Sequence, residues 1–253
     1  MNKESFPTSF HSYKRNIILI FLLVITALTT GHGQVLISLV LGDKLNTGKI
    51  EFGLDGGVNF PDIRGLDNGD MKAGFNLGFY FDIKIKESNW MVHTGVLVKS
   101  SMGASNLPVY SLNDPELDAI FEEGEVRRKI NYFNVPIAMK YKFQNNFFLE
   151  AGIMPALRAK AYDIFTTDIK DEDDLEYKLD IKDQIHRLDF GLIGGAGYRL
   201  MGGNGMNITA RYYYGLVDVV IDDSSPNQYN TCLYLSVGIP IGAGKARDKR
   251  EEK

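Results

Sequence analysis

The stretch AGFNLGFYFDIKIK, residues 73–86, alternates between two kinds of side chain at every step. The odd positions carry apolar residues such as Phe79 and Phe81, whereas the even positions carry small or polar residues such as Asp82 and Lys84. Successive side chains of a β-strand point to opposite faces of the sheet. The stretch therefore predicts a strand with one apolar face and one polar face.

Further segments between residues 49 and 241 repeat this alternation. Charged residues make up 24% of the chain, yet none of them occupies the apolar parity of any segment. One face of every expected strand therefore avoids charge. The other apolar parities run from Ile50 to Phe60, Trp90 to Val98, Phe133 to Phe143, Phe147 to Ala159, Leu188 to Leu200, Met206 to Leu216 and Leu233 to Ile241.

The connections between these segments are alternately short and long. Transmembrane β-barrels have short periplasmic turns and long outer loops, and an even number of strands leaves both ends of the chain in the periplasm. The spacing thus favours a membrane barrel. The short connections span residues 87–89, 144–146 and 201–205, and the long ones span 61–70, 101–128, 163–185 and 218–230.

Aromatic residues gather at the apolar parity beside the short turns, as in the aromatic girdle of a membrane interface. A soluble barrel of the lipocalin kind would also alternate, but charged residues would cover its outside. We therefore predict an all-β fold, an eight-stranded antiparallel up-and-down transmembrane barrel over residues 49–241, in the cell outer membrane. The expected girdle is Trp90, Tyr141, Phe143, Phe147 and Tyr198, with Phe60, Phe133, Tyr212 and Tyr214 at the other interface.

The N-terminal region has the layout of a signal peptide, which we assign to residues 1–33. The basic residues Lys14 and Arg15 precede an apolar run from Ile17 to Leu28, which is shorter than the roughly 20 residues that a membrane helix needs. An uncleaved anchor that continues through residues 35–41 is the alternative. We expect a lead-in over residues 34–48 and a charged periplasmic tail over residues 242–253.

Three segments carry a resemblance to a known family: YFNVPIAMKY at residues 132–141, LEAG at 149–152 and HTGVL at 93–97. They resemble the small outer-membrane β-barrel family called PorT-like or porin-family outer-membrane proteins. The resemblance extends over essentially the whole mature chain. It implies an outer-membrane barrel without catalytic residues, and one branch of the family is linked to secretion.

The polar parity, which should face the lumen, carries charges of both signs. These residues could line an ion path, or they could form a salt-bridge network that plugs a barrel too narrow for water. We favour the plug, since eight strands enclose a space that side chains just fill. The set comprises Glu51, Asp55, Asp82, Glu150, Asp189 and His93, with Lys84, Lys86, Lys99, Lys140, Lys142, Arg158, Lys160, Arg199 and Arg211.

The long connection over residues 163–185 is acidic, with a run from Asp171 to Asp174. It could collect Ca²⁺ or Mg²⁺, but it lacks the spacing of a dedicated calcium loop, so a solvated and self-repelling loop is the favoured interpretation. Earlier in the chain, Asp114 and Pro115 predict the start of a short helix that ends at Gly124. Leu117, Ile120 and Phe121 should share its apolar face, packed on the rim of the barrel.

Two prolines, Pro136 and Pro155, fall within expected strands, where a missing N–H breaks a ladder bond. We expect a bulge or local irregularity at each. The single cysteine, Cys232, falls on the inward parity and is interpreted as a small filler that forms no internal disulfide.

No catalytic, cofactor-binding or metal site is predicted. After removal of the signal peptide only His93 and His186 remain, and neither belongs to a triad or a metal-ligand spacing. The glycines of residues 191–197 do not open a helix, so they form no dinucleotide fingerprint. The net charge of −4 gives no indication of nucleic-acid binding.

We therefore expect a non-enzymatic protein, a plugged structural or interaction barrel with acidic extracellular loops. Its partners would be outer-membrane lipid, lipopolysaccharide and an envelope protein that the sequence does not identify. The alternatives are a narrow ion or small-solute channel and a component of a secretion apparatus.

Overall fold

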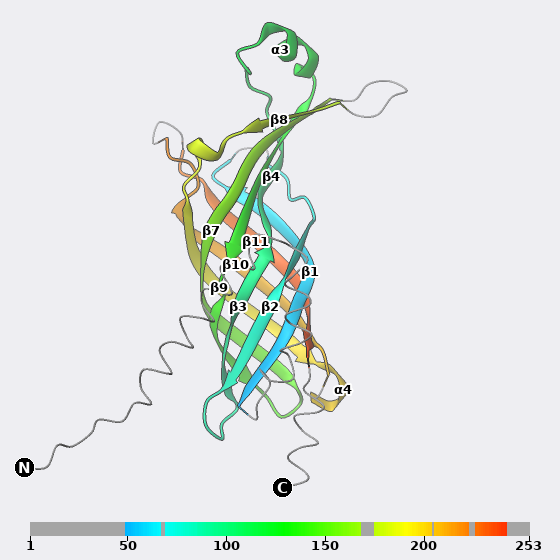
Figure 1. Ribbon diagram of the computed structural model, residues 1–253, viewed down its shortest axis with the longest axis vertical. Coiled ribbons are helices and arrows are strands. Elements are labelled where there is room, and N and C mark those ends of the chain that lie inside the picture. The colour runs from blue at the N-terminus through cyan, green and yellow to red at the C-terminus, as the bar shows by residue number, and fades with distance from the viewer. Residues whose placement is uncertain (1–48, 67–68, 168–174, 204, 223–225, 242–253) are drawn as a thin grey trace, which may run out of the picture.

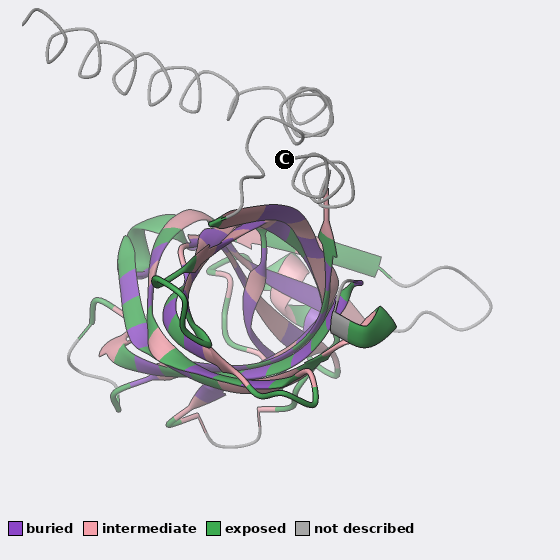
Figure 2. Cartoon of the chain, turned by 90° about the horizontal axis from the view of Figure 1, so that it is seen from below, coloured by how far each residue is buried: buried purple, intermediate pink, exposed green. Residues whose placement is uncertain are grey.

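The computed structural model describes residues 49–66, 69–167, 175–203, 205–222 and 226–241. These residues form one antiparallel sheet that closes on itself as a ring of eight strands, which confirms the predicted fold. Seen along its axis, the sheet forms a closed ring, and buried and exposed residues alternate along its strands (Figure 2). The expected signal peptide, the lead-in and the tail over residues 242–253 lie outside the described residues.

Two of the eight wall strands are each interrupted once, so the sheet has more elements than the wall has strands. β4 continues β3 beyond Ser100, and β6 continues β5 beyond Pro136. The strands are β1 (Ile50–Arg64), β2 (Gly74–Lys84), β3 (Trp90–Lys99), β4 (Ser101–Leu107), β5 (Glu125–Asn134), β6 (Ile137–Lys142), β7 (Phe147–Thr167), β8 (Leu175–Asp180), β9 (Leu188–Arg199), β10 (Asn207–Asp218) and β11 (Tyr229–Pro240).

The ring closes because each wall strand pairs with both of its neighbours. β1 pairs with β2 on one side and with β11 on the other, so the first and last strands meet. The remaining contacts run through β3, β5 with β6, β7, β9 and β10 in chain order. Closure leaves the wall without a free edge, which is the condition for strands in a bilayer.

The apolar parity faces outward over the middle of the wall, as predicted. Ile153 is 37% exposed and Leu149 is 46% exposed, whereas the intervening Glu150 is 4% exposed. At the short-turn end the girdle is continuous: the ring centroids of Trp90 and Tyr141 are 4.8 Å apart, and those of Tyr141 and Phe143 are 4.9 Å apart. A belt of this kind fits the hydrocarbon layer and its interface.

Two lysines that the strict alternation placed inside the barrel lie on its outside. In β3 one extra residue, Val98, shifts the register, since Gly78 pairs with Leu97 but Leu77 pairs with Lys99. In β7 the extra residue is Ala159, between the residues that pair with Asn131 and Tyr132. Each β-bulge reverses the parity of the residues that follow it. Lys99 and Lys160 are therefore exposed.

The prolines lie opposite each other. Pro136 occupies the break between β5 and β6, and the N–H of Val135 donates to the carbonyl of Pro155 at 2.9 Å. The prediction of an irregularity is confirmed at Pro136. It is wrong at Pro155, where the pairing with β9 continues without a shift, because its missing N–H faces the strand that is already interrupted.

The wall continues above the lipid-facing belt instead of ending in irregular loops (Figure 1). β4, β5 and the upper half of β7 pair over residues that the sequence assigned to long connections, and β8 returns along β7 as a hairpin. The expected solvated loop over residues 163–185 is thus in large part sheet, although Asp171 to Asp174 lie outside the described residues. The short helical turns η1 (Lys182–Gln184) and α4 (Leu200–Gly203) complete the connections.

The short helix α3 (Pro115–Phe121) forms where predicted, above the ends of β4 and β5. The Asp114 carboxylate caps it, since it accepts hydrogen bonds from the N–H of Glu116 and of Leu117. Phe121 is buried against the extended sheet, but Ile120 is 46% exposed and does not share the packed face, contrary to expectation. Among the residues that the structure describes, no helix is long and apolar enough to cross a membrane.

Candidate functional site

The interior of the barrel is the candidate site, because it gathers buried charges from five strands. Asp82 of β2 accepts a hydrogen bond from the Lys140 ammonium group of β6 at 2.8 Å. On β7, the strand next to β6, Glu150 accepts a hydrogen bond from the Arg211 guanidinium of β10 at 2.6 Å. His93 of β3 lies between the two pairs, with Nδ1 2.6 Å from Asp82 and Nε2 2.9 Å from Arg211. We call these five residues the lumen network.

The neighbours of His93 determine which of its nitrogens carries the proton. A guanidinium group has only donors, so Nε2 must accept the hydrogen bond from Arg211. The proton then resides on Nδ1, which donates to Asp82. His93 therefore links the two ion pairs into a single chain of hydrogen bonds across the lumen, and Asp82–Lys140 and Glu150–Arg211 do not behave as isolated pairs.

Burial makes this network costly to disturb. Lys140 is 3% exposed and Arg211 is 4% exposed. The Lys140 ammonium group is paired with the carboxylate of Asp82, and the Arg211 guanidinium with that of Glu150. The Lys140 ammonium group also lies 3.9 Å from the Glu150 carboxylate, so the two ion pairs attract each other. An unpaired buried ion costs several kcal/mol, which explains why the opposite charges meet.

A second layer closes the lumen nearer the short turns. Arg199 of β9 forms an ion pair with Glu51 of β1. The Tyr80 hydroxyl donates to the same carboxylate at 3.0 Å and accepts a hydrogen bond from the Asn207 side chain. This layer joins β1, β2, β9 and β10 below the lumen network.

A third layer, nearer the long connections, is polar but carries fewer charges. Asn134 donates to the hydroxyls of Ser100 and Tyr234, and Asn230 donates to Asp189 at 2.8 Å. Among the described residues, Asp189 forms no ion pair with an arginine. Arg158 instead donates to main-chain carbonyls of the η1 segment, one of them that of Ile185 at 2.5 Å.

Parity predicts Arg158 among the inward charges, but its position away from them depends on a bulge that parity does not reveal. Arg158 lies next to the bulge at Ala159, where β7 leaves the straight wall, and it is thereby placed to hold the segment over residues 182–185 across the upper end of the barrel. In the sequence, the bulge is indicated only by the nearby Pro155, which does not predict which way the Arg158 side chain points.

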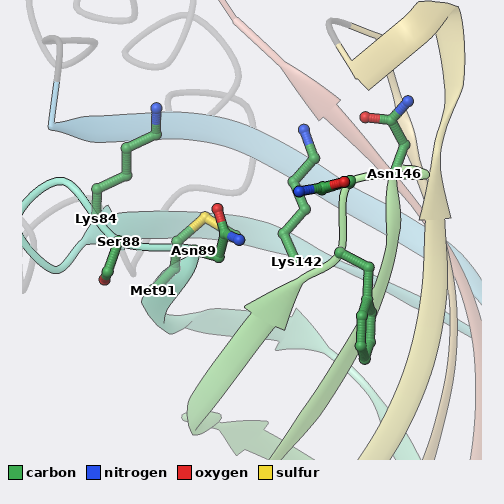
Figure 3. Close-up of a pocket in the computed structure, with 8 residues that line it drawn as sticks. Lys84, Ser88, Asn89, Met91, Lys142 and Asn146 are labelled. Carbon is green, nitrogen blue, oxygen red and sulfur yellow. The ribbon is translucent and has the colours of Figure 1, made fainter.

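A cavity of about 250 Å³ lies at the short-turn end. It is formed by the turns that follow β2 and β6, and Figure 3 shows Lys84 and Lys142 extending in the same direction from its wall. The other lining groups are mainly amides of the turns, such as Asn89 and Asn146. This cavity holds no arrangement of nucleophile and base.

Over the described ranges, no three His, Cys, Asp or Glu residues lie together as a metal site would require. His93 is engaged in the lumen network, and Cys232 is a free, buried thiol 3.6 Å from the Asn59 side-chain nitrogen. The chemistry that the interior offers is ionic and structural.

Comparisons with known proteins agree with this architecture. Residues 42–220 match the profile of a family described as "Outer membrane protein beta-barrel domain". A comparison with curated proteins returns no match.

Several solved structures are similar at low identity. Ail, the attachment invasion locus protein of Yersinia pestis, is 12% identical with a TM-score of 0.42, covering 76% of this chain and 99% of Ail. The neisserial surface protein NspA is 12% identical with a TM-score of 0.41, covering 74% of this chain and 96% of NspA. OprG of Pseudomonas aeruginosa is 16% identical with a TM-score of 0.34, covering 77% of this chain and 95% of OprG.

Proposed function

Since the chain belongs to the outer membrane protein β-barrel domain family, we propose that it is a closed, non-enzymatic barrel with a structural or interaction role in that membrane. The observation that carries the proposal is the lumen network. Ionised groups from β2, β6, β7 and β10 meet across the interior, joined by His93 of β3, and a second ionic layer lies below them. A water-filled path would need these layers to part.

Because the interior is closed, we infer that the function resides on the outer surfaces of the barrel. The outer end of the barrel, with α3 and the β7–β8 hairpin, projects beyond the lipid-facing belt and is the part available to other envelope molecules. We propose lipopolysaccharide and an envelope protein as its partners. A role in a secretion apparatus would use the same surface, and the geometry offers nothing that favours it further.

The test is conductance. Purified protein in a planar lipid bilayer should give no steady ion current. Replacing Glu150 and Arg211 together by alanine removes a bulky ion pair without leaving a lone buried charge, so this variant should leak. Arg158→Ala is the matched control, because this arginine lies outside the lumen network, and it should stay sealed.

A narrow channel is the alternative function. The cavity at the short-turn end, with Lys84 and Lys142 on its wall, would be the entrance of an anion path. A stable, ion-selective current from the unmutated protein would replace the closed barrel with this channel.

A further inference from the structure

The outside of the wall carries a group of cations just above the lipid-facing belt. The bulges at Val98 and Ala159 turn Lys99 and Lys160 outward on the two strands that flank β5. The Lys99 ammonium group lies 5.4 Å from the ring centre of Phe75, which confirms that it is on the outer face. Lys129 lies on β5, the strand between those of Lys99 and Lys160. Its sequence neighbours Arg128 and Ile130 point inward, so Lys129 points to the outer face.

Strand pairing fixes how close these three lysines are. Lys160 pairs with Asn131, and Lys129 lies two residues further along the same strand. Ser101 pairs with Asn131 and the N–H of Tyr132 donates to the carbonyl of Ser100, so Lys99 lies beside β5 at the level of Phe133, two residues below Asn131. Neighbouring strands are about 4.8 Å apart and two residues span about 7 Å, so Lys160 lies about 8 Å from Lys129 and about 12 Å from Lys99, and the three positions fit within roughly 15 Å. We call Lys99, Lys129 and Lys160 the outer lysine patch.

The charge of one carboxylate, that of Glu176 on β8, acts on Lys129 but forms no ion pair with the outer lysine patch. Of the described ion pairs, the one on this side joins Lys178 to Glu176, and none involves the outer lysine patch. Burial, together with the neighbouring Arg127, Lys99 and Lys178, lowers the pKa of Lys129. Arg127 contributes a buried Nε without a hydrogen-bond partner. The cations therefore repel one another until an anion lies among them.

The level of the patch indicates which anion this is. The patch begins at the level of the outward apolar residues Leu157 and Phe133, and above these two the outward residues are polar or charged. The patch thus coincides with the head-group region at the end of the barrel that carries the long connections, which is the outer leaflet. Phosphate is the anionic group of lipids at that depth, and lysine binds phosphate as a point charge.

We propose that the outer lysine patch binds the phosphate groups of lipopolysaccharide. The inference rests on the proposed function in one respect, that the long-connection end contacts the outer leaflet, and it names the residues that make the contact. Lipopolysaccharide carries its phosphates at the boundary between acyl chains and sugars, so several cations on one wall can be engaged while the acyl chains lie against the apolar belt.

The experiment measures binding of fluorescent lipopolysaccharide to the full-length protein, folded in detergent micelles. The test variant is K99Q/K129Q/K160Q. The matched control, K84Q/K86Q/K142Q, removes the same charge at the short-turn end. Both should keep the heat-dependent mobility shift of a folded barrel. The test variant should bind about tenfold more weakly or worse, and the control should match the unmutated protein.

Further arms identify the ligand. Enzymatically dephosphorylated lipopolysaccharide should bind the unmutated protein as weakly as intact lipopolysaccharide binds the test variant. Inorganic phosphate and phosphatidylglycerol micelles should compete poorly. Equal loss in both variants, no effect of dephosphorylation, or full competition by phosphatidylglycerol would each overturn the inference. If the unmutated protein conducts a steady current while its lipopolysaccharide binding still requires the outer lysine patch, the closed barrel is refuted and the inference holds.

Discussion

The lower and upper parts of the barrel use the same strands with opposite polarity. In the lower part of β7, Ile153 faces outward and Glu150 lies inside among ionised partners. In the upper part of the same strand, Lys160 faces outward and Phe165 lies inside, packed with Phe121 and Tyr177. The lower part is apolar outside and charged inside, whereas the upper part is arranged like a water-soluble protein.

The change of polarity along the strands marks the level at which the membrane ends. The reversal occurs at the level of the bulges at Val98 and Ala159, and it is visible on β5 as well, where the inward residues change from Asn134 to the apolar Ile130 and Val126. A β-bulge is a means of changing which parity faces out without ending the strand. The boundary between lipid and water is thus built into the register of the sheet.

The largest expected effect concerns the charged interior of the lower part. Arg211→Met leaves Glu150 buried beside Lys140 at 3.9 Å and His93, so it should lower the free energy of unfolding by about 3–5 kcal/mol. The measurement is urea unfolding in lipid vesicles. Adding Glu150→Gln removes the uncompensated carboxylate and should recover much of this loss. If the double variant were no more stable than the single one, the interior charges would not be coupled as described.

A smaller effect is expected on the outer face. Ile153→Lys places a cation against the hydrocarbon layer and should cost about 2–4 kcal/mol. Thr166→Lys, on the outward side of the upper part of β7 and paired with Glu125 and Glu176, should change stability by no more than about 0.5 kcal/mol. The same vesicle unfolding assay compares them. Equal tolerance at both positions would show that the polarity of the wall does not reverse.

The smallest effect concerns the upper part alone. Asp114→Ala removes the carboxylate that caps α3 and should destabilise the helix by about 1 kcal/mol. Limited proteolysis should then cleave faster near residues 115–121, while the heat-dependent mobility shift of the barrel stays unchanged. Glu123→Ala, at an exposed position just after the helix, is a nearby control for the loop itself. A loss of the mobility shift would mean that the upper part is not separable from the membrane barrel.

The sequence predicted the lower part in detail because one physical rule governs it. Hydrocarbon outside and a narrow lumen inside enforce a period of two, so the inward placement of Asp82, Glu150 and Arg211 followed directly from parity. The helix start at Asp114 was also predictable, because capping is a local property of a few residues. Which inward charge pairs with which was not, since pairing depends on the positions of strands that are distant in sequence.

The upper part was predicted poorly because its residues follow another rule. The bulges have no distinctive residue type, so strict alternation carried Lys99 and Lys160 into the lumen. Charged positions such as Asp163 suggested solvated loops, although this carboxylate is buried and accepts two hydrogen bonds from Arg128, at 2.9 and 2.8 Å. A buried ion pair between adjacent strands is indistinguishable, in sequence, from two exposed charges.

The pairing of β1 with β11 has a consequence for how the protein reaches its place. The ladder runs from Gly53 opposite Pro240 to Arg64 opposite Tyr229, so it joins the first strand made to the last. Any shorter piece of the chain has two open edges, which a bilayer does not tolerate. Insertion must therefore await the complete chain, and folding is dominated by contacts between distant residues, which are slow to form. During transit across the periplasm the unclosed chain exposes its outward apolar residues, and it depends on being kept from other chains until the final strand arrives.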